Sequence, residues 1–509
     1  MKKSIYTLSM LALGGMLALA GCGNGNNGGK ADNSASGTAN AGAEGAGAAG
    51  GLKPYKITLV YPGSAPKDLQ MVQDAMSKYL TEKINATIEL KPIEWGSWDD
   101  KTNLMKLSNE PFDLMFTASW FNYAKDVSKG QFLPLEELMA KNGKDIQGVL
   151  GDDFINGAKI SGKLYGLPTH KEFAQGFGLV LDKKLVDKYH FNTDGIKTLD
   201  DLETMFDTVK KNEPGVTPIV SLKLSSIWSA ANSDSLVTGL GIPRGSTELK
   251  AVDSLGQEPS EFDKKMDKWV KAGYFDKDYL TSDADQGLNL IKAGKAFSVA
   301  QSLKPGKDKE LSVTSGVDLV QVEIAKPFTV TGDAQGAMLA ISRTSKDPDR
   351  AMMFLNMLYT DKELLNMLVW GIEGVHYVKK SDNIIGYPDG VTAETTGYPN
   401  PGGWMFGDQF KDYLWDNEDP QKWAKFEEFN KSADHSIALG FTFDQEPVKA
   451  ELASIANVDK EFQPLLNGAT LENRPKIIEK YRKKRDAAGF ARVKEELQRQ
   501  LDEWAKTRK

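Results

Sequence analysis

Aromatic side chains carry the most informative chemistry in this chain of 509 residues, which contains 10 tryptophans. Three of them lie beside glycine, serine or asparagine instead of on an apolar helix face: Trp120, Trp228 and Trp404. A sugar presents flat C–H faces and a ring of hydroxyls, so its site needs exposed aromatic platforms and short polar side chains. We therefore expect each of the three indoles either to contact a carbohydrate ligand or to have a structural role.

The surroundings of other tryptophans favour structural roles. Trp95 and Trp98 lie in a loop after a predicted strand, and for them packing is favoured over ligand contact. Trp269 lies on an apolar helical face, and Trp504 ends the apolar stripe of the last predicted helix. We expect Trp269 and Trp504 to belong to the core.

Residues for catalysis or metal binding do not occur in recognisable patterns. The four histidines, His170, His190, His376 and His435, are far apart, and none belongs to an H-E-x-x-H motif. The sequence contains no G-x-S-x-G nucleophile elbow and no P-loop. Acidic residues are numerous, but nothing singles out a pair for glycoside hydrolysis. We predict no enzymatic activity, no metal site and no cofactor.

One reactive residue, Cys22, lies near the amino terminus. Lys2 and Lys3 precede the apolar segment 5–20, which is typical of a secretory signal and too short for a stable membrane span. The segment ends in Leu19-Ala20-Gly21-Cys22, the pattern of a bacterial lipobox, in which the thiol takes up a lipid. Cys22 is the only cysteine, so it cannot form an internal disulfide. The sequence predicts a signal peptide over 1–21 and lipidation of Cys22; the alternative is an ordinary signal peptide with a chance cysteine.

The residues after Cys22 predict a tether. Segment 23–51 consists almost entirely of Gly, Ala, Asn, Ser and Thr, and such a composition cannot form a core. We predict that 22–52 is a disordered, lipid-anchored tether. It would hold a globular body at the extracellular face of a cell membrane, as in a Gram-positive bacterium.

The charge of the mature chain argues against a nucleic-acid partner. Removing Lys2 and Lys3 with the signal peptide leaves 61 basic and 70 acidic residues, a net charge of −9. Domains that bind nucleic acid carry a basic patch and are usually basic as a whole. We therefore expect no nucleic-acid binding.

The rest of the chain predicts an α/β fold. A strand, a helix and a second strand follow one another over 57–61, 69–84 and 86–92, and a third strand is predicted over 112–117. This alternation indicates parallel strands covered by helices, with ligands bound beyond the carboxyl ends of the strands. Further strands and helices are predicted over 178–181, 199–211, 262–272, 296–300, 337–342, 348–370 and 491–507.

Several segments, taken in this order, resemble extracellular solute-binding protein family 1. They are Phe112-Asp113-Leu114-Met115-Phe116-Thr117, Phe132-Leu133-Pro134-Leu135, Gly162-Lys163-Leu164-Tyr165-Gly166-Leu167-Pro168, Asp347-Pro348-Asp349-Arg350-Ala351 and Gly371-Ile372-Glu373-Gly374-Val375-His376-Tyr377. The segment Gly440-Phe441-Thr442-Phe443-Asp444 and the closing Gln500-Leu501-Asp502-Glu503-Trp504 resemble the LplA/LipO-type subgroup.

The resemblance implies a periplasmic-binding-protein-like fold of two α/β lobes with interleaved chain crossings and a ligand cleft between them. By analogy, the first lobe holds 53–172 plus 322–376. The second holds 173–321 plus 377–509, including a C-terminal region of undefined function. The implied protein is the extracellular substrate-binding lipoprotein of an ABC importer, acting as a monomer. It would capture an oligosaccharide by cleft closure and deliver it to the permease subunits.

Four polar residues take their interpretation from this lobe arrangement. Lys171 and Glu172 lie at the first expected crossing, and Glu373 and His376 lie in a glycine-flanked turn after a predicted helix. We expect them either to hydrogen-bond the hydroxyls of the ligand or to hold the hinge together.

The chain departs from the family pattern at one site, and other functions of the same fold stay open. Some relatives carry a calcium loop after the helix that corresponds to 199–211, but here 212–218 has one carboxylate and two prolines. Calcium needs six to eight oxygen ligands, so no calcium site is expected there. A sensory ligand-binding lipoprotein and a peptide-binding receptor are the alternatives to sugar transport.

Overall fold

The computed structural model describes residues 51–220, 223–255, 260–275, 284–399, 402–466 and 473–507. The predicted signal peptide 1–21, the predicted lipidation site Cys22 and the predicted tether up to residue 50 lie outside the described residues. The description that follows concerns the unit Ala48–Lys509.

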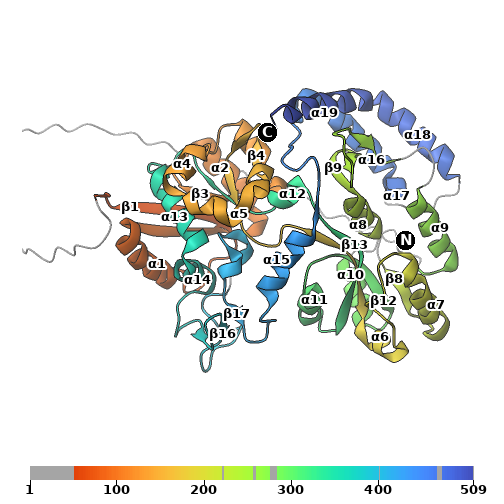
Figure 1. Ribbon diagram of the computed structural model, residues 1–509, viewed down its shortest axis with the longest axis horizontal. Helices are drawn as coiled ribbons and strands as arrows, with labels where there is room; N and C mark the ends of the chain where they lie inside the picture. The colour runs from red at the N-terminus through yellow and green to blue at the C-terminus, as the bar shows by residue number, and fades with distance from the viewer. Residues whose placement is uncertain are drawn as a thin grey trace, which may run out of the picture. The chain divides into compact units, whose positions relative to one another are not determined.

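A mixed five-stranded sheet forms the first lobe, in the strand order β2-β1-β3-β14-β6 (Figure 1). β1 pairs in parallel with β2 and with β3, whereas β14 is antiparallel to β3 and β6. The carboxyl ends of the first three strands therefore lie at one edge, as the strand–helix alternation predicts. The strands are β1 (Tyr55–Pro62), β2 (Ala86–Ile93), β3 (Leu114–Thr117), β6 (Gly166–Pro168) and β14 (Met338–Ile341).

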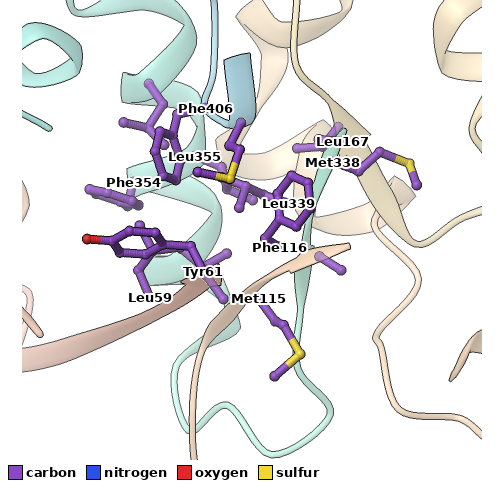
Figure 2. Packing of buried hydrophobic residues seen from close by; sticks show 14 of the residues in the cluster. Leu59, Tyr61, Met115, Phe116, Leu167, Met338, Leu339, Phe354, Leu355 and Phe406 are labelled. Atoms are coloured by element: carbon purple, nitrogen blue, oxygen red, sulfur yellow. The ribbon is translucent and has the colours of Figure 1, made fainter. Parts of the chain in front are cut away.

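Helices bury their apolar faces against this sheet. α1 (Leu69–Ile84) buries every fourth residue, Val72, Met76, Leu80 and Ile84, and ends at Asn85 in the left-handed conformation. Figure 2 shows the core, in which Tyr61 and Phe116 from the sheet lie near Phe354, Leu355 and Phe406. The other helices of this lobe are α2 (Trp98–Ser108), α3 (Tyr123–Ser128), α4 (Glu136–Asn142), α5 (Lys144–Gly157), α13 (Pro348–Thr360) and α14 (Lys362–Trp370).

The helix predicted over 348–370 is two helices, because it is interrupted at Asp361. The Asp361 carboxylate accepts hydrogen bonds from the backbone N–H groups of Glu363 and Leu364 and from the Tyr79 hydroxyl. A carboxylate that caps backbone N–H groups starts a new helix. The helical spacing of apolar residues continues from α13 into α14, so the sequence pattern does not predict this interruption.

A second five-stranded sheet, in the order β18-β13-β7-β12-β8, forms the second lobe. β7 lies antiparallel between β12 and β13, and β8 is parallel to β12. Gly178 of β7 permits the close approach, since a Cβ there would lie 1.9 Å from the Val322 carbonyl oxygen. The strands are β7 (Gln175–Asp182), β8 (Thr217–Val220), β12 (Ala296–Leu303), β13 (Leu319–Thr329) and β18 (Asp434–His435).

The helices of the second lobe pack around an aromatic core. Phe206, Trp269 and Phe297 are fully buried there, so Trp269 is a core residue as expected. The helices are α6 (Lys183–Tyr189), α7 (Glu203–Asn212), α8 (Lys223–Asn232), α9 (Glu261–Ala272), α10 (Ala284–Lys292) and α11 (Lys307–Ser315).

The chain passes between the two lobes repeatedly, which confirms the interleaved two-lobe fold. It leaves the first sheet through 169–174, between β6 and β7, and returns through 330–337, between β13 and β14. The return contains the short helix α12 (Thr331–Ala334). It then crosses again between β17 (Leu414–Trp415) and β18, through α15 (Lys422–Ser432).

Two lobe boundaries differ from those expected. β13 pairs along its length with β7, so the return to the first lobe follows Thr329 instead of 322. Tyr398, Met405 and Phe406 are buried in the core of the first lobe, although the sequence places 377–509 in the second. The physical reason is local: these apolar side chains fill the space beside α13 and α14, a contact that sequence spacing does not indicate.

The C-terminal region is built onto the second lobe. Its helices pack against a small sheet of β9 (Ser233–Val237), β10 (Leu240–Pro243) and β11 (Val252–Asp253). In this core, Val237 and Ile242 share a cluster with Val493 and Leu497. The helices are α16 (Lys449–Glu461), α17 (Gln463–Leu466), α18 (Arg474–Ala487) and α19 (Phe490–Ala505).

Candidate functional site

Three indoles meet at the carboxyl edge of the first sheet. Trp95 follows β2, Trp120 follows β3, and Trp404 comes from a one-turn helix almost 300 residues further along the chain. The ring of Trp95 lies 6.2 Å from that of Trp120 and 6.2 Å from that of Trp404, and the ring planes differ by 16° and 18°. We call this group the aromatic platform. It combines two of the predicted ligand-binding tryptophans with one for which a structural role was favoured.

Exposure distinguishes the platform from the aromatic residues that support it. Trp95 is 45% exposed and Trp120 is 52% exposed, whereas Trp98 is buried, as its favoured structural role requires. Phe121 packs against Trp98 and against Trp120. Adjacent exposed apolar side chains that form one patch are typical of a site of contact with another molecule.

The position of Trp120 is fixed by the chain segment that returns from the second lobe. Its indole N–H donates a hydrogen bond to the Gly336 carbonyl oxygen at 2.8 Å, and the Ser119 N–H donates to the Gln335 carbonyl oxygen at 2.8 Å. Only the polar edge of the indole is used in this bond. The crossing segment thus sets the orientation of the indole, about half of which is exposed.

A hollow of about 390 Å³ lies between the lobes, and Trp120 forms part of its wall. The hollow is lined by residues of both lobes and of both crossings, and we call it the interlobe hollow. Its lining is Trp120, Lys171, Glu172, Phe173, Ala174, Gln175, Ser302, Leu303, Lys304, Lys307, Gly332, Asp333 and Gly336. Pockets that bind small molecules are commonly concave sites of this size at the junction of domains.

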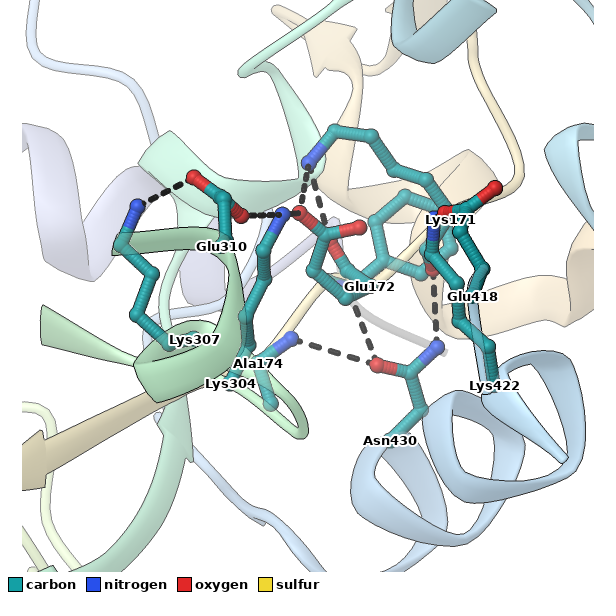
Figure 3. Close-up of polar contacts among 10 residues, drawn as sticks. Lys171, Glu172, Ala174, Lys304, Lys307, Glu310, Glu418, Lys422 and Asn430 are labelled. Carbon is teal, nitrogen blue, oxygen red and sulfur yellow. Dashed lines mark hydrogen bonds and ion pairs between the residues drawn. The ribbon is translucent and has the colours of Figure 1, made fainter. Parts of the chain in front are cut away.

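A chain of ion pairs crosses this hollow (Figure 3). Glu172, on the first crossing, accepts a hydrogen bond from Lys304 of the second lobe at 3.1 Å, and Lys171 Nζ lies 3.9 Å from the same carboxylate. Lys304 also pairs with Glu310 at 3.5 Å, and Glu310 with Lys307 at 2.5 Å. Lys171 and Glu172 therefore line the hollow, and Glu172 also connects the crossing to the second lobe, as the hinge role requires. Their contact with the hydroxyls of a ligand stays a prediction.

The ion pairs keep Glu172 ionised. Burial alone would raise the pKa of Glu172, but Lys171 and Lys304 outweigh burial and hold its pKa below the usual value. In the same way, burial works to lower the pKa of Lys304, while Glu172 and Glu310 raise it above the usual value. The hollow thus offers fixed charged donors and acceptors, which suit hydrogen bonds to hydroxyl groups.

Asp333 is an acid in this hollow that titrates near neutral pH. Burial raises its pKa to about 7, against the opposing effect of hydrogen bonds from the Val330 N–H and the Gln175 side chain and of the charge on Lys171. Asp333 caps α12 on the returning crossing. Its ionisation therefore changes the charge of the hollow and of a hinge segment together.

The stability of the wild-type chain relative to Asp333→Asn is expected to fall as the pH rises from about 4 to about 7 and to level off above that. The free carboxyl of aspartate titrates near pH 3.9, and folding raises this pKa to about 7. The stabilisation from a raised pKa is complete below the unfolded value and is lost as the pH rises through the folded value. Asparagine imitates the neutral form and removes this dependence. Denaturant unfolding of both proteins across this range measures the difference, and parallel profiles would contradict the assignment.

The structure does not bring Trp228, the third candidate ligand-binding tryptophan, to the aromatic platform. Trp228 lies on α8, where its ring stacks on Phe262 at 5.3 Å and 10°. It lines a different hollow, which shares no described residue with the interlobe hollow. The serines near Trp228 in the sequence lie on a helix, α8. Where this helix lies in the fold is decided by tertiary contacts, which the local sequence does not indicate.

Glu373 and His376 stabilise a turn. The His376 ring is buried, its Nδ1 accepts a hydrogen bond from the Ile372 N–H, and its Nε2 lies 3.3 Å from the Asp68 carboxylate. Glu373 pairs with Lys379 at 2.8 Å. Neither residue is among the described residues that line the interlobe hollow. Of the two roles open for them, the structure supports the structural one.

Several residues of the site carry no signal in the sequence. Lys304, Lys307 and Asp333 come from segments that are distant from one another and polar in an ordinary way. Trp95 offered a weak signal, because it follows a predicted strand at its carboxyl end. A position just after the carboxyl end of a strand therefore identifies a platform residue better than polar neighbours in the sequence do.

The arrangement is suited to holding a polar ligand with flat apolar faces. Stacked indoles can contact such faces, and the lysines and carboxylates of the hollow can hydrogen-bond its hydroxyls. Across the described ranges, no group of three or more His, Cys, Asp or Glu side chains is placed to hold a metal ion.

Comparison with known proteins gives two family matches within the chain. Residues 63–364 match the model of the family described as bacterial extracellular solute-binding protein. Residues 437–506 match a domain of unknown function, DUF3502, which corresponds to most of the C-terminal region. The chain is also 28% identical over 471 residues to a carbohydrate ABC transporter substrate-binding protein of Streptococcus pneumoniae serotype 4, covering 90% of this chain and 91% of that relative.

Solved structures of one S. pneumoniae protein match along nearly the whole chain. The N-glycan transport solute binding protein NgtS is 27% identical and matches 90% of this chain and 100% of its own, with a TM-score of 0.75. Its complex with Man1GlcNAc matches 89% of this chain and 100% of its own at 26% identity, with a TM-score of 0.64. Its complex with Man5GlcNAc matches 90% and 100% at 27% identity, with a TM-score of 0.62.

Proposed function

Because the chain belongs to the bacterial extracellular solute-binding protein family, we propose that it captures an oligosaccharide between its two lobes and delivers it to the permease of an ABC importer. The matched relative is named a carbohydrate ABC transporter substrate-binding protein, and NgtS is described with Man1GlcNAc and Man5GlcNAc. An N-glycan fragment of this type is therefore the first ligand to test.

The convergence of the three indoles of the aromatic platform carries this proposal. Trp95, Trp120 and Trp404 come from separate chain segments and stack beside a hollow with fixed charged groups. An oligosaccharide offers several ring faces in a row, and three adjacent indoles suit such a ligand better than a peptide backbone. Trp95 and Trp120 are also exposed side by side, as in a surface patch that contacts another molecule.

Movement of the lobes couples binding to delivery in this proposal. A ligand that contacts both lobes selects the closed arrangement, and the permease would recognise that arrangement. The ion pairs from Glu172 to the second lobe lie at the crossing where such a movement would occur.

The proposal includes binding without chemical conversion, and this is tested with Man5GlcNAc. The purified chain should return the oligosaccharide intact after long incubation, while its unfolding temperature rises with sugar concentration. At about one hundred times the dissociation constant, the ligand adds about 2.7 kcal/mol to the free energy of unfolding. Steady cleavage of the sugar that is abolished by replacing one carboxylate would show an enzyme instead.

We further propose that Cys22 anchors the protein to the membrane through a lipid. Within the part of the chain that the structure describes, no helix combines the length and the apolarity required to span a bilayer. Replacing Cys22 by alanine should move the protein from the membrane fraction to the medium or leave the signal peptide uncleaved. Fractionation followed by immunoblotting measures this, with Ser34→Ala in the tether as the control. A Cys22→Ala variant that is correctly cleaved and still membrane-bound would contradict the anchor.

A further inference from the structure

One face of α8 carries an indole among short polar side chains. Ser225, Trp228, Ser229 and Asn232 are spaced by three, four and seven residues from Ser225, so they lie on the same side of the helix. The sequence drew attention to Trp228 for this setting, but the proposed transport cleft does not use it. The helix face is therefore a candidate site of its own.

Trp228 is held flat, with one ring face already covered. Phe262 of α9 stacks on it at 5.3 Å with the ring planes only 10° apart. The indole is only partly buried and lines a hollow of about 390 Å³, which we call the α8 hollow. A ring that is held by an aromatic neighbour and borders a hollow can act as a platform for an apolar face.

Hydrogen-bonding groups line the α8 hollow together with the indole. Asp263 lies in the wall of the α8 hollow and pairs with Arg474 at 2.7 Å, and both side chains are largely buried. Asp253, in the same wall, pairs with Arg485. The hollow is lined by Ser225, Trp228, Ser229, Asn232, Ser233, Gly241, Pro243, Val252, Asp253, Ser254, Leu255, Ser260, Phe262, Asp263, Leu465, Leu466, Arg474 and Ile478.

The lining combines the chemical groups that a sugar ring requires. Trp228 supplies a platform, the serines and Asn232 supply neutral donors and acceptors, and the Asp263–Arg474 pair supplies charged ones in fixed positions. Charged groups that are already paired do not demand a charged ligand. A neutral sugar can therefore bind here without leaving a charge unbalanced.

We propose that the α8 hollow is a second carbohydrate site, which takes a terminal neutral sugar residue and is distinct from the interlobe hollow. The C-terminal region forms part of its wall through Leu465, Leu466, Arg474 and Ile478. All four fall within residues 437–506, the match to the domain of unknown function, so this domain gains a role in ligand contact. The proposal that the ligand is a sugar rests on the proposed function. The proposal that the site is a separate one rests on its lining, which shares no described residue with the interlobe hollow.

Fluorine NMR of 5-fluorotryptophan in the mature chain tests this proposal. Single Trp→Phe variants assign the resonances, and mannose, N-acetylglucosamine and Man5GlcNAc are titrated separately. The Trp228 resonance should shift in a saturable manner with at least one of these sugars. It should do so equally in a Trp120→Ala/Trp404→Ala protein, whose cleft is disabled. The Trp269 resonance is the matched control, because this indole is fully buried in the same lobe and should not move.

The possible results separate the second site from the cleft. A Trp228 resonance that stays fixed while those of Trp120 and Trp404 saturate would overturn the second site and leave the transport function intact. A shift of Trp228 that disappears in the disabled protein would also overturn it, because Trp228 would then report lobe closure. A shift of Trp228 with fixed Trp120 and Trp404 resonances would support the second site and contradict the cleft.

Discussion

Replacing Trp120 by alanine should weaken oligosaccharide binding by at least tenfold and change stability little. Losing the apolar contact of a large side chain costs about 1.5–3 kcal/mol, and losing a stacked ring costs roughly 0.5–1.5 kcal/mol more. A tenfold change in the dissociation constant corresponds to about 1.4 kcal/mol. Because Trp120 is 52% exposed in the free protein, its truncation removes little of the buried core.

The neighbouring indoles give this experiment its internal comparison. Trp95→Ala and Trp404→Ala should weaken the same binding event, because Trp95 stacks with both other rings and the Trp404 ring lies 6.5 Å from that of Trp120. Trp504→Ala is the control, since Trp504 packs on Phe441 in the C-terminal core and lies outside both hollows. Calorimetric titration of the four variants measures the effects. Wild-type affinity in all three platform variants would show that the ligand binds elsewhere.

Replacing Trp269 by alanine should lower the free energy of unfolding by about 3–5 kcal/mol, the usual cost of truncating a buried tryptophan. Trp269 is fully buried, packs edge-on against Phe206 at 5.2 Å, and donates a hydrogen bond to Glu203 at 2.9 Å. Alanine would leave a cavity and remove a donor from a carboxylate that Lys268 and Lys265 also contact. Urea unfolding of the wild type and the variant measures the loss.

Two further measurements show whether this effect is one of packing alone. Trp269→Phe keeps an aromatic ring in the core and should lose less stability than Trp269→Ala. Sugar affinity in the folded fraction of both variants should stay near that of the wild type, because Trp269 lies outside the interlobe hollow. A large loss of affinity at constant stability would contradict the core assignment.

The strand–helix alternation of the first lobe was predictable because it rests on local spacing. Val72, Met76 and Leu80 recur at helical intervals, and the neighbouring strands are short apolar runs. Residue spacing cannot predict that the chain returns to its first sheet after forming a second. The resemblance to the solute-binding family predicted this return. The boundary at Thr329 needed the structure, because only pairing with β7 shows where β13 ends.

The candidate site was predictable only where chemistry and chain position agreed. Trp120 follows a strand at its carboxyl end, and parallel strands bring such residues to one edge. Trp228 has polar neighbours in the sequence, as Trp120 does, but it lies on a helix. Its sequence neighbours therefore do not indicate which residues surround it in the folded chain. Asp333 drew no attention, since its raised pKa arises from burial between segments that meet only in the folded chain.

The central claim is that an oligosaccharide binds between the lobes by contact with the aromatic platform. A glycan array that includes Man5GlcNAc and other mannose-, galactose-, glucose- and N-acetylglucosamine-terminated oligosaccharides tests it most directly, with the wild type and the Trp120→Ala/Trp404→Ala protein applied in parallel. The account predicts that the wild type retains at least one class of oligosaccharide and that the double variant, shown to be folded, loses it. Equal retention of every glycan by both proteins, or retention of none by the wild type, would contradict the claim.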